Sequence, residues 1–483
     1  MKLIYDVGDR PTFKQSVVFA FQQMIAIMAA TLLVPILMSN YTLSDGATTL
    51  VFDPAAALFG AGIGTIVYIL CTKRKSPVFL GSSFTFLGAY QAIIGMNYGY
   101  WGVIIGIIFA GLVYVVIALL IKAIGSAWVS KLMPTVIIGP IVVLIGLSLS
   151  GTATGWMATN GGDTYSLLTI FIGAITFFTI VYVSIFGSKT LKLIPFIIGV
   201  GGGYILALIF TLIGNATGNA TMQILNLDIL TSISSIVSLP KFTFIQALSQ
   251  QPAGVLPIDG AALGNIAMTF VPIGVVELAQ HIADHKNLGA IIEKDLIKDP
   301  GLDKTLLGDG LGSIVGGFFG GAANTTYGES IGCVAITGNA SIYSIVLAAV
   351  GCMLLSFFTP FVTLINSIPK CVMGGACVAL YGFIAVSGLQ MLKRVDLGNN
   401  KNLFVVSSIL VTGIGGLSLN FGTNPATGGS LLVVTSLATA LIMGIITNLI
   451  ANGGQMTDDS KDALSEATDK MGEVDFPDDN KKN

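Results

Sequence analysis

Long runs of apolar residues cover most of this chain and constrain its fold more than any other feature. A helix that crosses the hydrocarbon core of a bilayer needs about 20 predominantly apolar residues. Stretches of about this length lie at residues 15–38, 51–71, 101–121, 133–151, 166–187, 193–213, 263–285, 340–366, 371–392, 402–420 and 427–451. Three less regular stretches lie between them, at 78–95, 306–320 and 322–338. The pattern predicts an all-α polytopic membrane protein with fourteen transmembrane segments.

The composition agrees with this class and argues against soluble ones. The chain is 53% hydrophobic and only 10% charged, and its 59 glycines allow helices to pack closely in a bilayer. Five cysteines lie in apolar or small-residue segments without a CxxC pair, which argues against a disulfide framework and a zinc site. Residues 452–483 form a polar, acidic tail that we expect to be disordered.

Basic residues indicate the orientation in the membrane. They gather in alternate loops, at residues 73–75, 122–131, 189–192, 286–304 and 393–394, whereas the intervening loops are nearly uncharged. Cytoplasmic loops of membrane proteins are enriched in Lys and Arg. We therefore expect both termini to be cytoplasmic and the protein to be a multi-pass protein of the cell membrane.

One predicted membrane helix carries a polar stripe. Glu277, Gln280, His281 and Asp284 recur at helical spacing and fall on one face. Ionisable groups are costly in hydrocarbon unless they meet a partner or a wet cavity, so they mark transport or proton pathways. A buried salt bridge that only fixes helix packing is the alternative interpretation, but four polar groups on one face exceed what packing needs.

The two halves of the chain repeat three motifs in the same order. The pairs are 59–67 with 307–315, 23–28 with 280–285, and 133–139 with 368–374. Seven predicted segments separate the equivalent positions, and this odd number gives the second copy the opposite orientation in the membrane. Inverted repeats of this kind are typical of secondary transporters, whose sites lie near the midplane between broken helices.

Each half contains one interrupted segment, with the sequences LGSSFTF at 80–86 and ANTTYGESI at 323–331. Gly, Ser, Asn and Thr favour extended or capping conformations over a helix exposed to lipid. We expect each interruption to be a short strand leading into a half-helix whose free N–H groups point at the site. Two weakly hydrophobic surface loops are the alternative, and Glu329 among apolar residues counts against it.

Four motifs in order resemble the nucleobase–cation symporter-2 family, also called nucleobase–ascorbate transporters, and within it the bacterial uracil permeases most closely. They are Leu80–Phe84 after Pro77, Gln280–Asp284, Lys294–Leu302, and Asn324–Glu329, which is the most specific. The resemblance covers nearly all of the chain to about residue 450. It implies two inverted repeats of seven segments, with short strands in segments 3 and 10.

The resemblance also implies a division into a core domain and a gate domain. The core domain would comprise residues 1–131 and 263–366, and the gate domain residues 132–215 and 367–451. Residues 216–262 would form an extracellular connection, and 452–483 a cytoplasmic tail. Family members often dimerise through the gate domain, so a homodimer is an expectation here as well.

For the substrate site, the resemblance implies that Glu329 accepts hydrogen bonds from ring N–H groups of a nucleobase. Backbone amides near Phe84 and Gly328 would donate to its carbonyl oxygens. The pocket would be completed by Tyr327, Ala30 and Tyr381. A planar ligand with alternating donors and acceptors fits such a set of a carboxylate, backbone N–H groups and aromatic rings.

The chain departs from the family pattern at several positions. Gln280 stands where a substrate-contacting carboxylate is usual, and Asp284 follows one turn later, where the family often has His or Asp. Ser330 and Gly338 replace a usual Asn and Arg. Gln280 both donates and accepts hydrogen bonds, so recognition of a base survives, but the choice of base is open. Glu277 is a candidate to replace part of the missing charge.

Protons are the expected energy source, with Asp284, Glu277 and His281 as candidate coupling residues. Carboxylate, hydroxyl and carbonyl oxygens also suit sodium, so the sequence leaves the coupling ion open. We expect no other cofactor, no metal site and no nucleic-acid partner. The expected function is import of a nucleobase, most simply uracil, by proton symport with an elevator-type mechanism.

Three other functions are consistent with parts of the sequence. A xanthine or other purine symporter would share the family motifs. An anion transporter of the same architecture would present basic groups at the midplane, where Glu329 would instead repel the substrate. A membrane enzyme could use His281, His285 and Glu277 as zinc ligands or a catalytic pair, but the chain has no second metal-binding cluster.

Overall fold

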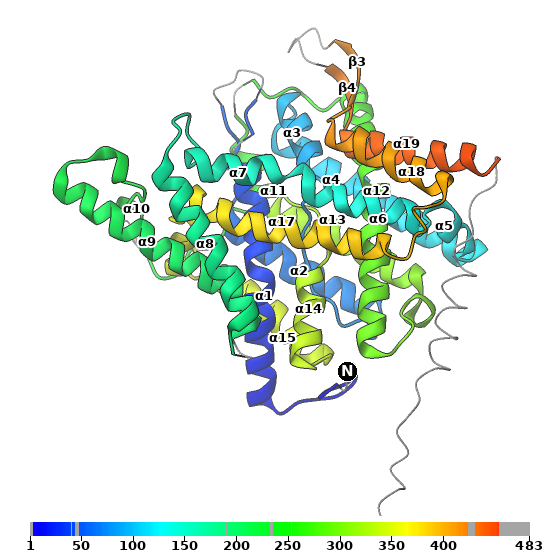
Figure 1. The fold of residues 1–483 in the computed structure, drawn as a ribbon, viewed down its shortest axis with the longest axis horizontal. Helices are drawn as coiled ribbons and strands as arrows, with labels where there is room; N and C mark the ends of the chain where they lie inside the picture. The colour runs from blue at the N-terminus through cyan, green and yellow to red at the C-terminus, as the bar shows by residue number, and fades with distance from the viewer. Residues whose placement is uncertain are drawn as a thin grey trace, which may run out of the picture.

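The described part of the computed structural model comprises residues 3–39, 41–43, 48–188, 191–231, 235–252, 254–423 and 430–453. Helices make up nearly all of it (Figure 1). Residues 454–483, most of the predicted acidic tail, lie outside the described residues.

Eight helices in this part are long and apolar enough to cross a membrane. They are α1 (Phe13–Met38), α2 (Pro54–Cys71), α4 (Gly99–Ile124), α6 with α7 (Thr135–Ser148 and Ser150–Thr159), α8 (Leu167–Phe186), α9 (Pro195–Thr217), α12 (Gly260–Ile292) and α17 (Lys370–Leu392). In Figure 1, α6 and α17 run across the view, whereas α1 and α12 run up and down in it. The chain is therefore a multi-pass, all-helical membrane protein, as its apolar runs predict.

Ten further helices are described in the bundle. They are α3 (Leu87–Gly95), α5 (Ala127–Leu132), α10 (Asp228–Thr231), α11 (Thr243–Ser249), α13 (Leu302–Gly320), α14 (Gly328–Thr337), α15 (Ile342–Leu355), α16 (Thr359–Asn366), α18 (Asn400–Ile414) and α19 (Ser436–Ala451). The stretch 340–366, which the sequence suggests is one segment, is divided between α15 and α16.

Two of the apolar stretches at the C-terminal end are only partly helical. A hairpin of β3 (Leu419–Thr423) and β4 (Ser430–Val434) joins α18 to α19. The expectation of continuous helical segments at 402–420 and 427–451 is wrong for this part. The intervening sequence NPATGG is rich in residues that end regular structure and favour a turn.

The repeated glycine motifs pack against each other. A Cβ added at Gly60 would lie 2.3 Å from the carbonyl oxygen of Gly316, and one at Gly64 would lie 2.8 Å from that of Gly312. The helices α2 and α13 are therefore antiparallel, with their backbones in direct contact. Gly64 and Gly312 are equivalent positions of the two repeats, so this contact has the geometry of a two-fold axis.

A short pair of strands lies beside this contact. β1 (Leu80–Ser82) and β2 (Asn324–Thr326) pair antiparallel, with Leu80 opposite Thr326 and Ser82 opposite Asn324. Equivalent hydroxyl residues hold them: the amide of Leu80 donates to Thr65 Oγ1 over 2.9 Å, and Ser313 Oγ donates to the carbonyl of Asn324. The two interruptions thus form strands as expected, and the strands pair with each other.

The N-terminal segment contacts the C-terminal ends of α12 and α14. Ile4 N–H donates to the carbonyl of Gly338 over 2.7 Å, directly after α14. Lys294, directly after α12, pairs with Asp6 at 2.6 Å and holds the pKa of that carboxyl below its usual value. These contacts fix α14 relative to α12.

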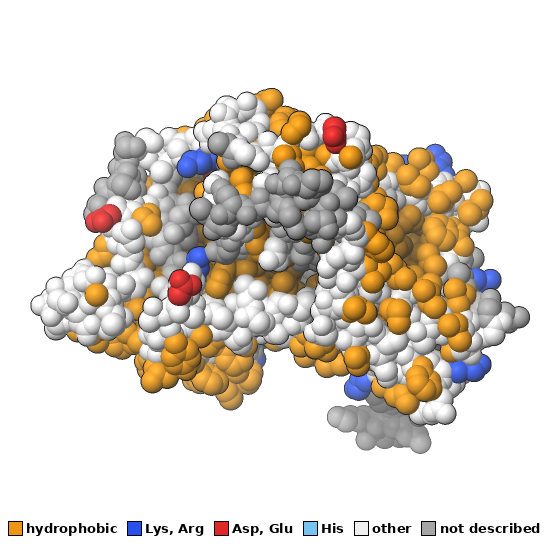
Figure 2. All heavy atoms as spheres, turned by 90° about the horizontal axis from the view of Figure 1, so that it is seen from above, with side chains coloured by type: hydrophobic (Ala, Val, Ile, Leu, Met, Phe, Trp, Pro, Cys, Tyr) orange, Lys and Arg blue, Asp and Glu red, His pale blue; other side chains and the backbone are white. Residues whose placement is uncertain are grey.

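The exterior is apolar, as contact with lipid requires. Figure 2 shows hydrophobic side chains over much of one face and few charged ones. Exposed large side chains recur along α8 at Phe171, Phe178, Tyr182, Ile185 and Phe186. In water such a surface would promote aggregation, whereas in a bilayer it faces hydrocarbon.

Candidate functional site

Two half-helices begin at the strand pair in the middle of the bundle. α3 follows β1 after a short turn, and α14 follows β2 directly. Because the strands are antiparallel, the two helices leave the pair in opposite directions. The N-cap residue of neither helix caps it through its side chain, which favours first-turn N–H groups as donors to a ligand. In α3 the N–H of Leu87 is already used, because it donates to the carbonyl of Phe84 over 3.1 Å.

Open space lies in front of these helix ends. Gly88 of α3 and Gly328 of α14 are both exposed. A Cβ added at Gly328 would meet no atom within 4 Å. Glu329, in the first turn of α14, and Gln280 of α12 are half-buried, and α12 packs against α14. The site therefore offers backbone donors next to a carboxylate acceptor.

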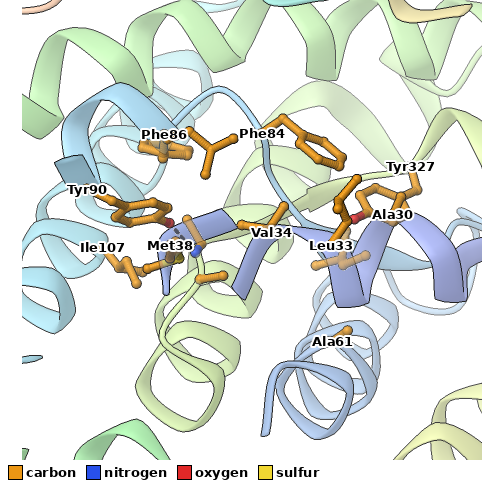
Figure 3. Packing of buried hydrophobic residues seen from close by; sticks show 14 of the residues in the cluster. Ala30, Leu33, Val34, Met38, Ala61, Phe84, Phe86, Tyr90, Ile107 and Tyr327 are labelled. Carbon is orange, nitrogen blue, oxygen red and sulfur yellow. Dashed lines mark hydrogen bonds between the residues drawn. The ribbon is translucent and has the colours of Figure 1, made fainter. Parts of the chain in front are cut away.

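Aromatic side chains form the walls beside the strands. The rings of Phe84 and Tyr381 meet edge to face, 5.5 Å apart. The hydroxyl of Tyr327 donates to the carbonyl of Ser82 over 2.7 Å, which lays its ring against Gly81. Figure 3 shows Tyr327 beside Ala30 of α1, with Phe84 on the same side of that helix. Sequence-predicted pocket residues from four separate segments thus lie around the strand pair.

The polar stripe of α12 faces protein partners. Glu277 accepts a hydrogen bond from Ser83 Oγ over 2.9 Å, and Asp284 accepts one from Thr326 Oγ1 over 2.8 Å. Both carboxylates are buried, at 1% and 8% exposure. The stripe therefore connects α12 to the end of β1 and to β2.

His281 points to a partner on α13 that the sequence argument missed. Its Nδ1 lies 2.6 Å from Asp309 Oδ2, and its Nε2 lies 3.1 Å from Thr305 Oγ1. His281, Asp309 and Thr305 are all fully buried. Asp309 is the one charged residue in the motif 307–315, where the first copy has Ala61. That difference between the repeats was the available signal.

Ser330 links three segments at the start of α14. Its Oγ accepts hydrogen bonds from Gln23 Nε2 of α1 and, over 3.0 Å, from the amide of Phe79. The serine at this position of departure from the family pattern therefore holds α14 against α1 and the entry to β1.

Both histidines are hydrogen-bonded to protein groups. His285 Nδ1 lies 2.8 Å from the carbonyl of His281, and its Nε2 lies 2.7 Å from the hydroxyl of Tyr68. All four ring nitrogens of His281 and His285 thus have protein partners. In the described part of the chain, no group of three His, Cys, Asp or Glu side chains is placed to hold a metal.

A family model matches this chain along most of its length. It is the model of the permease family Xan_ur_permease, and it matches residues 14–421. The chain belongs to this family. It corresponds to the nucleobase–cation symporter-2 family that the motifs resemble, so the protein is a nucleobase permease and not an enzyme.

Similar proteins agree in both sequence and fold. The chain is 37% identical to a uracil permease of Bacillus caldolyticus over 94% of this chain and 95% of that protein. It is 35% identical to a uracil permease of Bacillus subtilis (strain 168), over 93% and 95%. The transmembrane domain of a cyanobacterium bicarbonate transporter, BicA, superposes with a TM-score of 0.52 at 14% identity, over 92% of this chain and 99% of that one. The last match shows a shared fold.

Proposed function

We propose that this permease imports a nucleobase, with uracil as its first substrate, by proton symport. The observation that carries the proposal is the position of Glu329 beside Gly328 at the open N-terminus of α14. A carboxylate accepts ring N–H groups and backbone amides donate to ring C=O groups, the alternation that a pyrimidine base presents. The printed names of the Bacillus relatives support uracil.

Recognition would use residues from both repeats. Glu329 accepts from the base, and the amides near Phe84 and Gly328 donate to it. Gln280 serves as a neutral partner that donates and accepts. The pocket walls are Tyr327, Ala30 and Tyr381. A base whose polar groups do not match would leave buried groups unpaired, which discriminates strongly between similar ligands.

The transport movement we propose is an elevator. Fourteen segments in two inverted repeats would form a core domain, with residues 1–131 and 263–366, and a gate domain, with residues 132–215 and 367–451. The direct contact of Gly64 with Gly312 supports a two-fold relation between the repeats. The core domain would carry the base past the gate domain, as repeats do in related transporter architectures.

Proton coupling would use the stripe of α12. Asp284, Glu277 and His281 are the coupling candidates, and all three are buried. Protonation of a buried carboxylate removes a charge that is costly to move through a bilayer. The protein would lie in the cell membrane with both termini in the cytoplasm, as a homodimer joined through the gate domain.

Two alternatives lead to different substrates. A purine such as xanthine would use the same acceptor and donors, and Gln280 in place of a carboxylate leaves room for it. The second alternative is an anion transporter, because this chain shares its fold with a bicarbonate transporter. Glu329 would repel an anion at the helix end that otherwise attracts one, which favours a base with N–H donors.

Uptake into proteoliposomes tests the proposal. Labelled uracil should accumulate when the lumen is more alkaline than the medium, in potassium buffers free of sodium, and a protonophore should abolish accumulation. A panel of unlabelled bases then ranks substrates, with uracil expected to compete best. If xanthine competes better than uracil, the purine symporter is favoured. Uptake that depends on sodium and is insensitive to the protonophore would overturn proton coupling.

A further inference from the structure

Two arrangements of hydrogens fit the contacts of the His281–Asp309 pair, and they differ by one proton. Thr305 Oγ1 lies 3.2 Å from the carbonyl of Leu302 and 3.1 Å from His281 Nε2, so its single hydrogen goes to one of the two. When Thr305 donates to Leu302, it accepts from His281 Nε2, and Nδ1 and Asp309 Oδ2, only 2.6 Å apart, share a second hydrogen. In that arrangement the pair holds one shared proton and has no net charge.

Loss of this proton requires a different arrangement. A ring nitrogen without hydrogen would face a carboxylate oxygen at 2.6 Å, and the two lone pairs would repel. The remaining ring hydrogen must then be on Nδ1, and the Thr305 hydroxyl must turn to donate to Nε2. In turning, Thr305 gives up the carbonyl of Leu302. The two protonation states thus differ in hydrogen bonding as well as in charge.

The surroundings make the deprotonated state costly. Glu277 and Asp284 of α12 lie within electrostatic range of Asp309 and would repel an added negative charge. From α4, the ring of Tyr114 lies 5.8 Å from that of His281. On the other side, the ring of His285 lies 4.1 Å away and contacts Tyr68 of α2. A buried unpaired charge among such neighbours is strongly unfavourable. We therefore expect the pair to lose its proton only when a conformational change admits water to the site.

Strand β2 connects the pair to the base site. Thr325 Oγ1 lies 3.5 Å from Asp309 Oδ2, and the next residue, Thr326, donates to Asp284. Tyr327, Gly328 and Glu329 follow directly and form part of the proposed pocket. A change in the charge of Asp309 therefore acts on a strand that leads within four residues into Glu329.

We propose that the His281–Asp309 pair holds the coupling proton of this permease, with Thr305 as the hydroxyl that reorients when the proton leaves. This inference rests on the proposed function and assigns its proton to one place. Binding of the proton would strengthen binding of the base, and binding of the base would strengthen binding of the proton, because both act on β2. Linkage then requires that each promotes the binding of the other by the same factor.

Equilibrium binding of uracil at different pH values tests the assignment. Wild-type protein in detergent, in sodium-free potassium buffer, should lose affinity by up to about tenfold per pH unit on the alkaline side, the limit for one linked proton. Asp309→Asn keeps the shape of the side chain but holds no proton, and it should bind uracil with a flat pH profile. It should also lose proton-driven accumulation while exchanging external for internal uracil. Asp284→Asn tests the rival coupling candidate on the stripe of α12, and its affinity should still depend on pH if the proton lies on the His281–Asp309 pair.

Thr305 provides a second test that does not depend on the stability of Asp309→Asn. Thr305→Val removes the acceptor of the Nε2 hydrogen and should move the midpoint of the pH profile to lower pH. Thr305→Ser retains the hydroxyl and should restore the wild-type midpoint.

The outcomes separate the two proposals. Wild-type protein that binds no base of the panel would overturn the proposed function, and this inference with it. Uracil binding that is independent of pH in the wild type, or still dependent on pH in Asp309→Asn, would overturn the inference alone. So would loss of the dependence in Asp284→Asn but not in Asp309→Asn.

Discussion

At the residue scale, the buried polar side chains of this permease are arranged as partners rather than as isolated charges. His285 shows the principle: its Nδ1 lies 2.8 Å from the carbonyl of His281, and its Nε2 lies 2.7 Å from the hydroxyl of Tyr68. The hydroxyl of Tyr68 also donates to Ser76 Oγ over 2.7 Å. Glu329 and Gln280 differ from this set because both are half-buried. Their exposure marks them as the groups open to a substrate.

Replacing Glu329 by Gln should weaken uracil binding strongly. The change removes a charge-assisted hydrogen bond worth about 1.5–3 kcal/mol, or roughly ten- to a hundredfold in affinity. Calorimetric titration of the purified variant would measure the loss. Glu293→Gln is the matched control, because Glu293 is exposed at the C-terminal end of α12. Unchanged affinity in Glu329→Gln would remove this residue from the site.

Replacing Gln280 by Glu should change specificity and pH dependence more than it changes folding. The position is half-buried, so a carboxylate there is not fully desolvated. It would introduce the carboxylate that the family resemblance implies at this position and add a second acceptor for ring N–H groups. Competition by a panel of bases at several pH values would detect the change. Identical competition and pH curves would show that Gln280 does not face the base.

At the element scale, the structure shows which features of the fold are local in sequence. The long helices follow from hydropathy, and the strands at 80–82 and 324–326 follow from the polar interruptions that precede each half-helix. The pairing of these strands and the reciprocal contact of α2 with α13 join residues more than 240 positions apart, as with Leu80 and Thr326. Periodicity within one segment carries no information about such contacts.

The same distinction explains what was missed at the site. The helical spacing of Glu277, His281 and Asp284 predicts a common face, but their partners lie on other elements. The sequence does not single out Asp309, because the motif around it indicates close packing of glycines. The hairpin at 419–434 was missed because its apolar residues resemble the flanking helices more than they resemble strands.

The contact between α2 and α13 should tolerate no side chain at its centre. Gly60→Ala places a Cβ 2.3 Å from the carbonyl oxygen of Gly316 and 3.3 Å from the amide nitrogen of Gly320. Both contacts are with backbone atoms, so a helix must move to make room. We expect a loss of about 1–3 kcal/mol in the free energy of unfolding, as for other overpacked sites. Gly264→Ala in α12 is the control, since a Cβ there meets nothing within 4 Å. Its better helix propensity should leave stability unchanged or raise it by up to about 1 kcal/mol. Unfolding in detergent would compare the two, and equal stabilities would contradict the close contact.

At the scale of the whole molecule, the site lies where the proposed core and gate domains meet. Phe84 precedes α3 and Tyr381 belongs to α17, and their rings touch across this boundary. α12 also contacts β4, α19 and α6 of the proposed gate domain. An elevator movement would have to break these contacts in each cycle, whereas the contact between α2 and α13 lies within the core domain and would persist.

A disulfide across this boundary should therefore stop transport. A Cβ added at Gly88 of α3 would lie 3.8 Å from Thr435 Cγ2, directly before α19, so side chains at these two positions are in contact. The double variant Gly88→Cys and Thr435→Cys should lose uracil uptake on oxidation and recover it on reduction, because the core domain can no longer slide past the gate domain. Each single variant controls for the substitutions, and the native cysteines interfere little because four of the five are buried. If the cross-linked protein transports uracil as fast as the chemically reduced protein does, transport needs no relative movement of α3 and α19. That result would overturn the elevator.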